Sequence, residues 1–78
     1  MRELVLFLAK QLVNHPDDVE VKETQGETAS VLELKVARED IGRVIGKQGR
    51  TAKSIRTILN AVASRTNRKV ILEILEDK

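Results

Sequence analysis

The chain has 78 residues, a length that accommodates one domain, and its 41% hydrophobic and 33% charged residues are a balance typical of globular proteins. It contains no cysteine, which excludes disulfides and thiolate metal sites and fits a reducing cytoplasm. The apolar run from Leu4 to Ala9 is far shorter than the roughly 20 residues of a membrane span. We therefore expect a small cytoplasmic protein, with one domain over residues 1–78 and neither a transmembrane helix nor a signal peptide.

The net charge of +2 conceals a strongly basic segment. Residues 38–69 carry nine Lys and Arg side chains against Glu39 and Asp40, whereas the segments on either side are net acidic. A basic segment inside an otherwise acidic chain favours an anionic partner that binds at one place. The alternative is that these side chains only solvate a helix face.

A helix and a hairpin are predicted for the first half of the chain. Residues 2–13 have the wide apolar face of a buried helix, and Pro16 ends this pattern. Apolar and polar residues then alternate over 18–23 and over 31–37, with Gly26 in the turn between them, which predicts two paired strands. Phe7, the only aromatic residue, belongs to the apolar helix face, so we expect it in the core.

Two helices and a strand are predicted for the second half. Residues 38–45 indicate a short helix whose start is favoured by Glu39 and Asp40, residues 50–65 the longest helix, and residues 69–75 a last strand. The economical packing for this order is an α+β fold, in which three helices cover one face of a three-stranded sheet.

The longest helix has two contrasting sides on a wheel of about 100° per residue. Its apolar side predicts core residues, namely Ala52, Ile55, Ile58, Leu59, Val62 and Ala63. The opposite side carries the small residues Ser54, Thr57, Ala61 and Ser64. A face without long charged side chains could admit the same helix of a second copy, so we predict a dimer face there; an ordinary exposed helix face is the alternative.

Three of the four glycines fall in the stretch IGRVIGKQG, residues 41–49. This spacing excludes two common phosphate-binding loops. A dinucleotide-binding loop needs a glycine where Val44 stands, and a Walker A loop needs Ser or Thr where Gln48 follows the Gly-Lys pair, with four residues rather than three before that pair. We expect Gly42 to be a packing glycine where the short helix meets the sheet.

The remaining interpretation is a GXXG turn between two helices, at the start of the longest one. Unpaired N–H groups and the dipole of a helix N-terminus favour a phosphate, and glycines let a nucleic-acid backbone approach closely. Basic side chains add attraction, and aliphatic side chains of the preceding helix offer a wall for unstacked bases. The candidate nucleic-acid contacts are Gly46, Lys47, Gln48, Gly49, Arg50, Ile41, Arg43, Val44, Ile45 and Lys53. For Ile41, Val44 and Ile45 the alternative is a place in the core, which we expect for at least one of them.

The stretch IGRVIGKQGRTAKSIRTIL resembles the signature of the KH nucleic-acid-binding domain, whose GXXG loop clamps about four nucleotides of a single strand. The element order resembles the type II arrangement, αββααβ, with a mixed sheet. Over essentially its whole length, the chain is similar to the small single-KH proteins of the bacterial KhpA family, although its variable loop, QGETAS, is very short.

The resemblance implies that the partner is single-stranded RNA and that the protein is an RNA-binding protein or RNA chaperone. The residues themselves offer no metal cluster or nucleotide loop, so we expect neither a cofactor nor a metal. It also implies a homodimer, or a heteromer with the larger KH protein KhpB (Jag/EloR), and a connection with cell elongation, cell shape and cell wall biogenesis. We expect Gly46→Asp, or Lys47→Asp together with Gln48→Asp, to abolish RNA binding and leave the fold intact.

Other functions remain open. A helix-turn-helix binder of duplex DNA would read base edges with polar side chains such as Thr51, Ser54 and Thr57. A KH fold used chiefly for dimerisation would need no RNA at all. An enzyme is the least favoured, because His15 has no second histidine, Asp17 and Asp18 have the positions of turn residues, and no nucleophile–base pair stands out.

Overall fold

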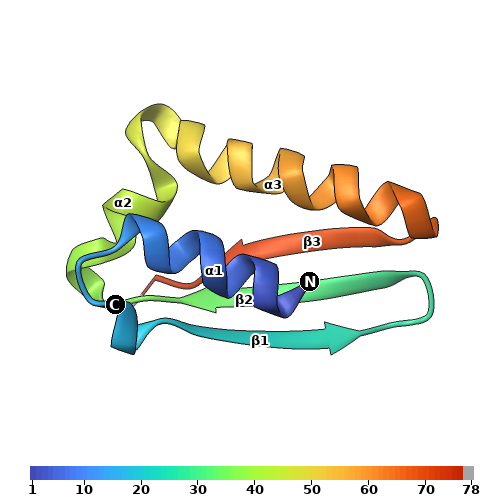
Figure 1. The fold of residues 1–78 in the computed structure, drawn as a ribbon, viewed down its shortest axis with the longest axis horizontal. Coiled ribbons are helices and arrows are strands. Elements are labelled where there is room, and N and C mark those ends of the chain that lie inside the picture. Colours follow the sequence, from blue (N-terminus) through green and yellow to red (C-terminus); the bar gives the residue numbers. More distant parts are fainter. Residues whose placement is uncertain (77–78) are drawn as a thin grey trace.

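A computed structural model describes residues 1–76 as a three-stranded sheet with its helices on one face (Figure 1). The predicted α+β order is confirmed, and the last two residues of the predicted domain, 77–78, lie outside the described residues. The helices are α1 (Arg2–Leu12), α2 (Ile41–Ile45) and α3 (Arg50–Ala63), and the strands are β1 (Glu20–Gln25), β2 (Ala29–Lys35) and β3 (Lys69–Ile74). Short 3-10 turns cover Pro16–Asp18, Arg38–Asp40, Lys47–Gly49 and Ser64–Thr66. None of the described helices is long and apolar enough to cross a membrane.

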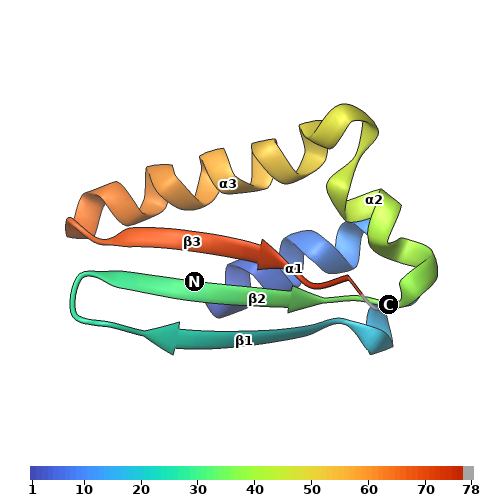
Figure 2. The same ribbon diagram turned by 180° about the vertical axis from the view of Figure 1, so that it is seen from behind.

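The sheet is mixed and has the order β1-β2-β3. Strands β1 and β2 form an antiparallel hairpin, in which Val21 pairs with Leu34, and β2 and β3 run parallel, with Leu32 beside Leu72. Alternate side chains of each strand point toward the helices, whereas none of the helices in residues 1–76 covers the other face (Figure 2). The parallel pairing requires the long crossover through α2 and α3, which carries the glycine-rich turn.

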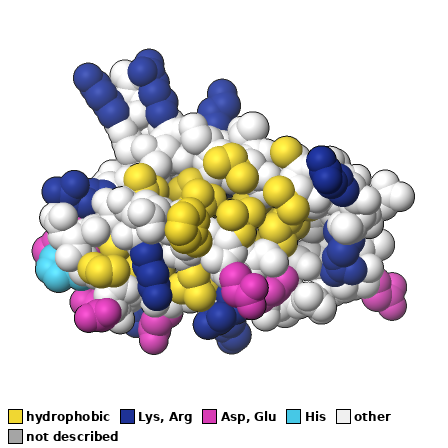
Figure 3. All heavy atoms as spheres, viewed as in Figure 1, with side chains coloured by type: hydrophobic (Ala, Val, Ile, Leu, Met, Phe, Trp, Pro, Cys, Tyr) yellow, Lys and Arg dark blue, Asp and Glu magenta, His cyan; other side chains and the backbone are white. Residues whose placement is uncertain are grey.

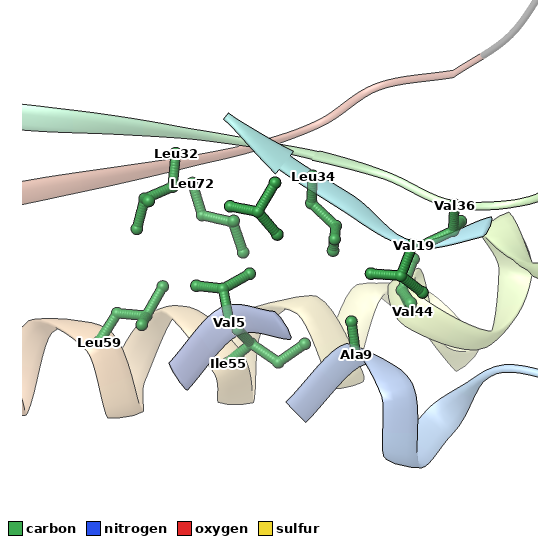
Figure 4. Close-up of a cluster of buried hydrophobic side chains, with 11 residues drawn as sticks. Val5, Ala9, Val19, Leu32, Leu34, Val36, Val44, Ile55, Leu59 and Leu72 are labelled. Carbon is green, nitrogen blue, oxygen red and sulfur yellow. The ribbon is translucent and has the colours of Figure 1, made fainter. Parts of the chain in front are cut away.

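The core lies between the sheet and the helices and draws on every layer (Figure 4). Leu32 and Leu34 of the central strand are fully buried, as are Val5 of α1 and Leu59 of α3. The complete buried cluster comprises Val5, Ala9, Val19, Val21, Leu32, Leu34, Val36, Val44, Ile55, Leu59 and Leu72. Because α2 contributes a side chain to this cluster, the helix before the turn is anchored to the body of the domain.

Three residues predicted to be core are exposed instead. Phe7 is 61% exposed, because it lies about 160° around α1 from the fully buried Val5, on the side away from the sheet. Ile58 and Val62 are 42% and 46% exposed, because they flank the buried stripe of α3. Apolar side chains accordingly gather on the face of the molecule that α1 and α3 present (Figure 3).

Candidate nucleic-acid interface

The turn between α2 and α3 has a backbone that ordinary residues rarely adopt. Three of its four residues have positive φ: Gly46 (φ 78°, ψ 172°), Gln48 (φ 58°, ψ 26°) and Gly49 (φ 74°, ψ 12°). Two backbone hydrogen bonds hold the turn, from Gly46 N to Gly42 O at 2.8 Å and from Gly49 N to Gly46 O at 3.1 Å. The chain thereby reverses within four residues, and α3 starts at the tip of the turn.

The two loop glycines serve different purposes. A Cβ atom at Gly46 would lie 2.6 Å from Thr51 Cβ and 2.8 Å from Thr51 N, so the fold itself excludes a side chain there. At Gly49 the same atom would meet nothing within 4 Å. The expectation that Gly46→Asp leaves the fold intact is therefore wrong, and Gly49 is the loop glycine whose bare backbone faces open space.

Gly42 also faces open space. It is exposed, and a Cβ atom there would meet nothing within 4 Å, so the expectation of a packing glycine against the sheet is wrong. A second bare stretch of backbone thus lies on the exposed side of α2, one helical turn before the loop.

The tip of the turn is accessible and has free donors. Lys47 and Gln48 are exposed, and within residues 1–76 their N–H groups have no acceptor. The N–H groups of Gly46, Gly49 and Arg50 are already bonded within the chain. Gly49 is the N-cap residue of α3, and no side chain caps this helix, so its positive end is available to an anion. The geometry can hold one phosphate against two free N–H groups and a helix N-terminus.

The predicted contacts beside the turn divide into accessible and inaccessible ones. Arg50 and Lys53 are exposed on the first turns of α3, and Ile41 and Ile45 are half-buried on α2. Val44 is 0% exposed, so its predicted role as a wall for bases is wrong: it faces the sheet, because it occupies the core side of the short helix.

Arg43 is held by the chain itself. It lies about 160° around α2 from both Ile41 and Ile45, and its Nε is 3.8 Å from Asp40 Oδ1. With the amide of Asn14 assigned so that its oxygen faces Arg43, that oxygen accepts hydrogen bonds from Nε at 3.2 Å and Nη2 at 3.0 Å. The structure therefore favours Arg43 as a link between α2 and the end of α1, rather than as a contact beside the two isoleucines.

The buried carboxylate of Asp40 organises this link. It accepts hydrogen bonds from Asn14 N at 3.1 Å and His15 N at 2.9 Å, and it lies 2.9 Å from His15 Nδ1. Asp40 was expected to favour the start of a helix, yet its side chain does not cap α2 and instead fastens the preceding turn to the end of α1. The sequence offered little signal for this contact, because Asn14 and His15 precede Asp40 by 26 and 25 residues.

The same contacts shift two pKa values in opposite directions. The hydrogen bond to Asp40 raises the pKa of His15 above its ordinary 6.5, although desolvation opposes this shift. Burial alone would raise the pKa of Asp40, but the hydrogen bonds from Asn14 and His15 outweigh it and hold that pKa below 3.8. His15 is therefore a structural residue of the junction between α1 and α2.

Two of the polar residues that a helix-turn-helix protein would need to contact DNA bases are engaged within the chain itself. Thr51 is half-buried against Gly46, and the Thr57 hydroxyl donates to Lys53 O at 3.0 Å within α3. The four residues of the predicted dimer face, Ser54, Thr57, Ala61 and Ser64, are all exposed. Their role in association remains a prediction.

Sequence comparison decides the family. The family model described as "KhpA/KhpB, KH domain" matches residues 2–74. The chain belongs to this family. A Clostridium perfringens protein named "RNA-binding protein KhpA" is 56% identical over 96% of this chain and its own full length. A Chlamydia caviae protein of the same name is 53% identical over the full length of both chains. A Listeria monocytogenes protein of the same name is 50% identical over 97% of this chain and its own full length.

The KH fold also occurs in larger proteins. A structure of Era in complex with MgGDPNP and nucleotides 1506–1542 of 16S ribosomal RNA matches 97% of this chain, with a TM-score of 0.61 and 26% identity. The match covers 30% of the Era chain. A variant of Aquifex aeolicus Era bound to GDP.AlF4- matches to a similar extent, with a TM-score of 0.60. The type II KH fold predicted from the sequence is confirmed.

Proposed function

We propose that this protein is a non-enzymatic single-stranded RNA-binding protein that holds about four nucleotides at the Gly46–Gly49 turn. The observation that carries the proposal is the accessible tip of that turn, with free N–H groups at Lys47 and Gln48 and bare backbone at Gly49. Single strands are clamped in this way by GXXG loops, which take about four nucleotides. The names of the relatives support RNA as the partner, as does the RNA in the Era complex.

In the proposed complex, phosphates and bases contact different parts of the interface. One phosphate accepts hydrogen bonds from the free N–H groups at the start of α3, where the helix dipole favours negative charge. Lys47, Arg50 and Lys53, all exposed, attract neighbouring phosphates. The half-buried Ile41 and Ile45 contact the bases. Phe7 is exposed but lies on α1, so neither the loop nor the helices beside it provide an aromatic platform for stacking.

Salt dependence tests this proposal quantitatively. If Lys47, Arg50 and Lys53 neutralise about three phosphates, the slope of log K against log salt concentration for a single strand is about −2. Fluorescence anisotropy with a labelled hexauridylate measures this slope, and unlabelled duplex DNA serves as the competitor. Equal competition by duplex DNA, or a slope near zero, would refute the proposal.

Association with a second KH protein is a second part of the proposal. Exposed Ile58 and Val62 adjoin the small residues Ser54 and Ala61 on α3, so a close helix–helix contact would bury apolar surface there. We propose a homodimer, or a heteromer with the larger KH protein KhpB, formed through this face. Two linked sites raise the avidity for RNA without any new contact, which suits a cytoplasmic RNA chaperone. Sedimentation with and without RNA measures this association.

A further inference from the structure

The outer edge of β3 offers backbone groups beside α3. Lys69 N donates to Thr28 O at 3.1 Å and Leu75 N donates to Leu34 O at 2.9 Å, so odd-numbered residues of this segment direct their backbone groups toward β2. Backbone groups alternate in direction along a strand, so those of Val70, Leu72 and Ile74 face away from β2. Since β3 is the last strand in the sheet, these groups lie along its open edge.

Arg56 covers one of these groups. It is exposed on α3, and its Nη2 donates a hydrogen bond to Leu72 O at 3.2 Å. That bond takes one of the five N–H donors of the guanidinium and fixes the plane of the fork against the strand. Within residues 1–76 no other hydrogen bond of Arg56 is found, so its remaining N–H donors are free to meet a ligand beside this edge.

The opposite edge of the sheet carries a similar contact. Arg2 of α1 donates from Nε to Val21 O at 3.0 Å, on the outermost strand β1. Gly26 N donates to Ala29 O at 2.7 Å, and the register of the hairpin then directs the backbone groups of Val21 away from β2. Covered carbonyls of this kind also protect an open edge from pairing with another strand. Arg2 is therefore the control for a purely protective role.

The two arginines differ in their position relative to the RNA interface. Arg56 lies on the helix that begins at the turn, about 10 Å along its axis from Gly49, and one turn beyond the exposed Lys53. Arg2 lies at the start of α1, at a distance from the turn between α2 and α3 (Figure 1). A strand that runs from the Gly46–Gly49 turn along α3 would therefore pass Arg56, whereas Arg2 lies on a different helix.

We propose that Arg56 selects the base that lies beside β3 and favours guanine over adenine. The inference rests on the proposed RNA binding and assigns a specificity to it. Guanine presents O6 and N7 as two acceptors that match the arginine fork, whereas adenine presents an amino group next to N7. By covering Leu72 O, Arg56 also removes the carbonyl that could accept a hydrogen bond from that amino group.

Two RNA hexamers, UUGUUU and UUAUUU, test the inference in anisotropy titrations. We expect the wild-type protein and Arg2→Met to bind the guanine hexamer about tenfold more tightly. Arg56→Met keeps the aliphatic stem, lacks the donors and is expected to bind the two hexamers equally. Arg56→Lys keeps the charge and can still contact guanine O6 and N7, but without the rigid fork, so it is expected to bind both hexamers tightly with a weaker preference than the wild-type protein. Thermal unfolding shows whether each variant is folded, and Arg56→Lys serves if Arg56→Met is not.

The outcomes separate the inference from the function on which it rests. An unchanged preference for the guanine hexamer in folded Arg56→Met or Arg56→Lys overturns the inference. Arg56 would then only protect the sheet edge from pairing with another strand, like Arg2. Equal binding of both hexamers by the wild-type protein overturns it as well, but leaves RNA binding intact. Failure of the wild-type protein to bind either hexamer overturns the proposed function itself.

Discussion

Replacing Gly46 by alanine tests how strictly the turn depends on a missing side chain. The residue has φ 78° and ψ 172°, a region that is essentially restricted to glycine and costs another residue about 1–3 kcal/mol. The new Cβ would also lie 2.8 Å from the backbone nitrogen of Thr51, which cannot rotate away, and overpacking of this kind costs a further ~1–3 kcal/mol. We therefore expect Gly46→Ala to lower the free energy of unfolding by about 4 kcal/mol.

Gly49→Ala is the matched control. The same methyl group is added three residues later, at φ 74° and ψ 12°, where it meets nothing within 4 Å. The only cost of Gly49→Ala is then that of the left-handed conformation, which lowers the free energy of unfolding by about 1–2 kcal/mol. The two alanine variants should differ by about 2–3 kcal/mol, in a domain of this length whose total stability is on the order of 4–12 kcal/mol.

Urea unfolding followed by far-UV circular dichroism gives both free energies, and thermal melts check them. At about 4–8 °C per kcal/mol for a domain of this size, Gly46→Ala should lower Tm by more than about 15 °C and Gly49→Ala by roughly 4–16 °C. Folded Gly49→Ala should nevertheless bind RNA more weakly, because its methyl group occupies the open approach to the backbone. Equal destabilisation by the two substitutions would refute this account of the turn.

Two further predictions concern the junction and the dimer face. The folded-state pKa of His15 is raised, so the stability that His15 contributes is complete below pH 6.5 and falls as the pH rises through this folded-state pKa. The folded-state pKa of Asp40 is lowered, so the stability that Asp40 contributes is present above pH 3.8 and falls as the pH drops through that folded-state pKa. Urea unfolding across this range should show both losses in the wild-type protein, and persistence of the loss above pH 6.5 in His15→Gln would assign that loss to other groups. Ala61→Arg places a long cation on the small-residue face of α3 and is expected to yield monomers in sedimentation. Gln11→Arg, which introduces the same side chain at an exposed position of α1, should not change the oligomeric state. Dimers of Ala61→Arg would exclude this face.

The elements were predictable because local patterns define them. Alternation identified the strands and the 3.6-residue period identified the helices. The first strand nevertheless begins at Glu20 rather than at residue 18, because Pro16 and the two aspartates after it form a 3-10 turn. Proline at the first position of a helical turn, followed by acidic residues, is a signal that the strand pattern concealed.

Burial was predicted less well than secondary structure. A helical wheel shows that Ile58 and Val62 flank the buried stripe of α3, but it does not show how far a neighbouring element covers that flank. The consecutive apolar residues of α1 exceed what one face can bury, which leaves Phe7 outside. Conversely, one of the three aliphatic residues Ile41, Val44 and Ile45 was expected in the core, but the sequence did not identify it as Val44.

Contacts between distant segments were beyond reach of the sequence. The hydrogen bonds of Asp40 join residues 25 and 26 positions apart, and that of Arg56 depends on how β3 lies beside α3. The sharp turn at Gly46–Gly49 was predictable because glycine spacing reports a backbone requirement directly. Even there, the sequence did not separate Gly46, which the fold needs, from Gly49, which is open to a ligand.

The most direct measurement of the central claim is RNA binding by the double variant Lys47→Asp/Gln48→Asp. Both side chains are exposed, and aspartate tolerates the left-handed conformation of position 48, so the fold should persist. The same residue pair, Lys10-Gln11, is exposed on α1 and provides a control with the same change of charge. We predict that hexauridylate binds the wild-type protein and the α1 double variant but not the loop variant, with all three folded; undiminished binding by the loop variant would contradict the account.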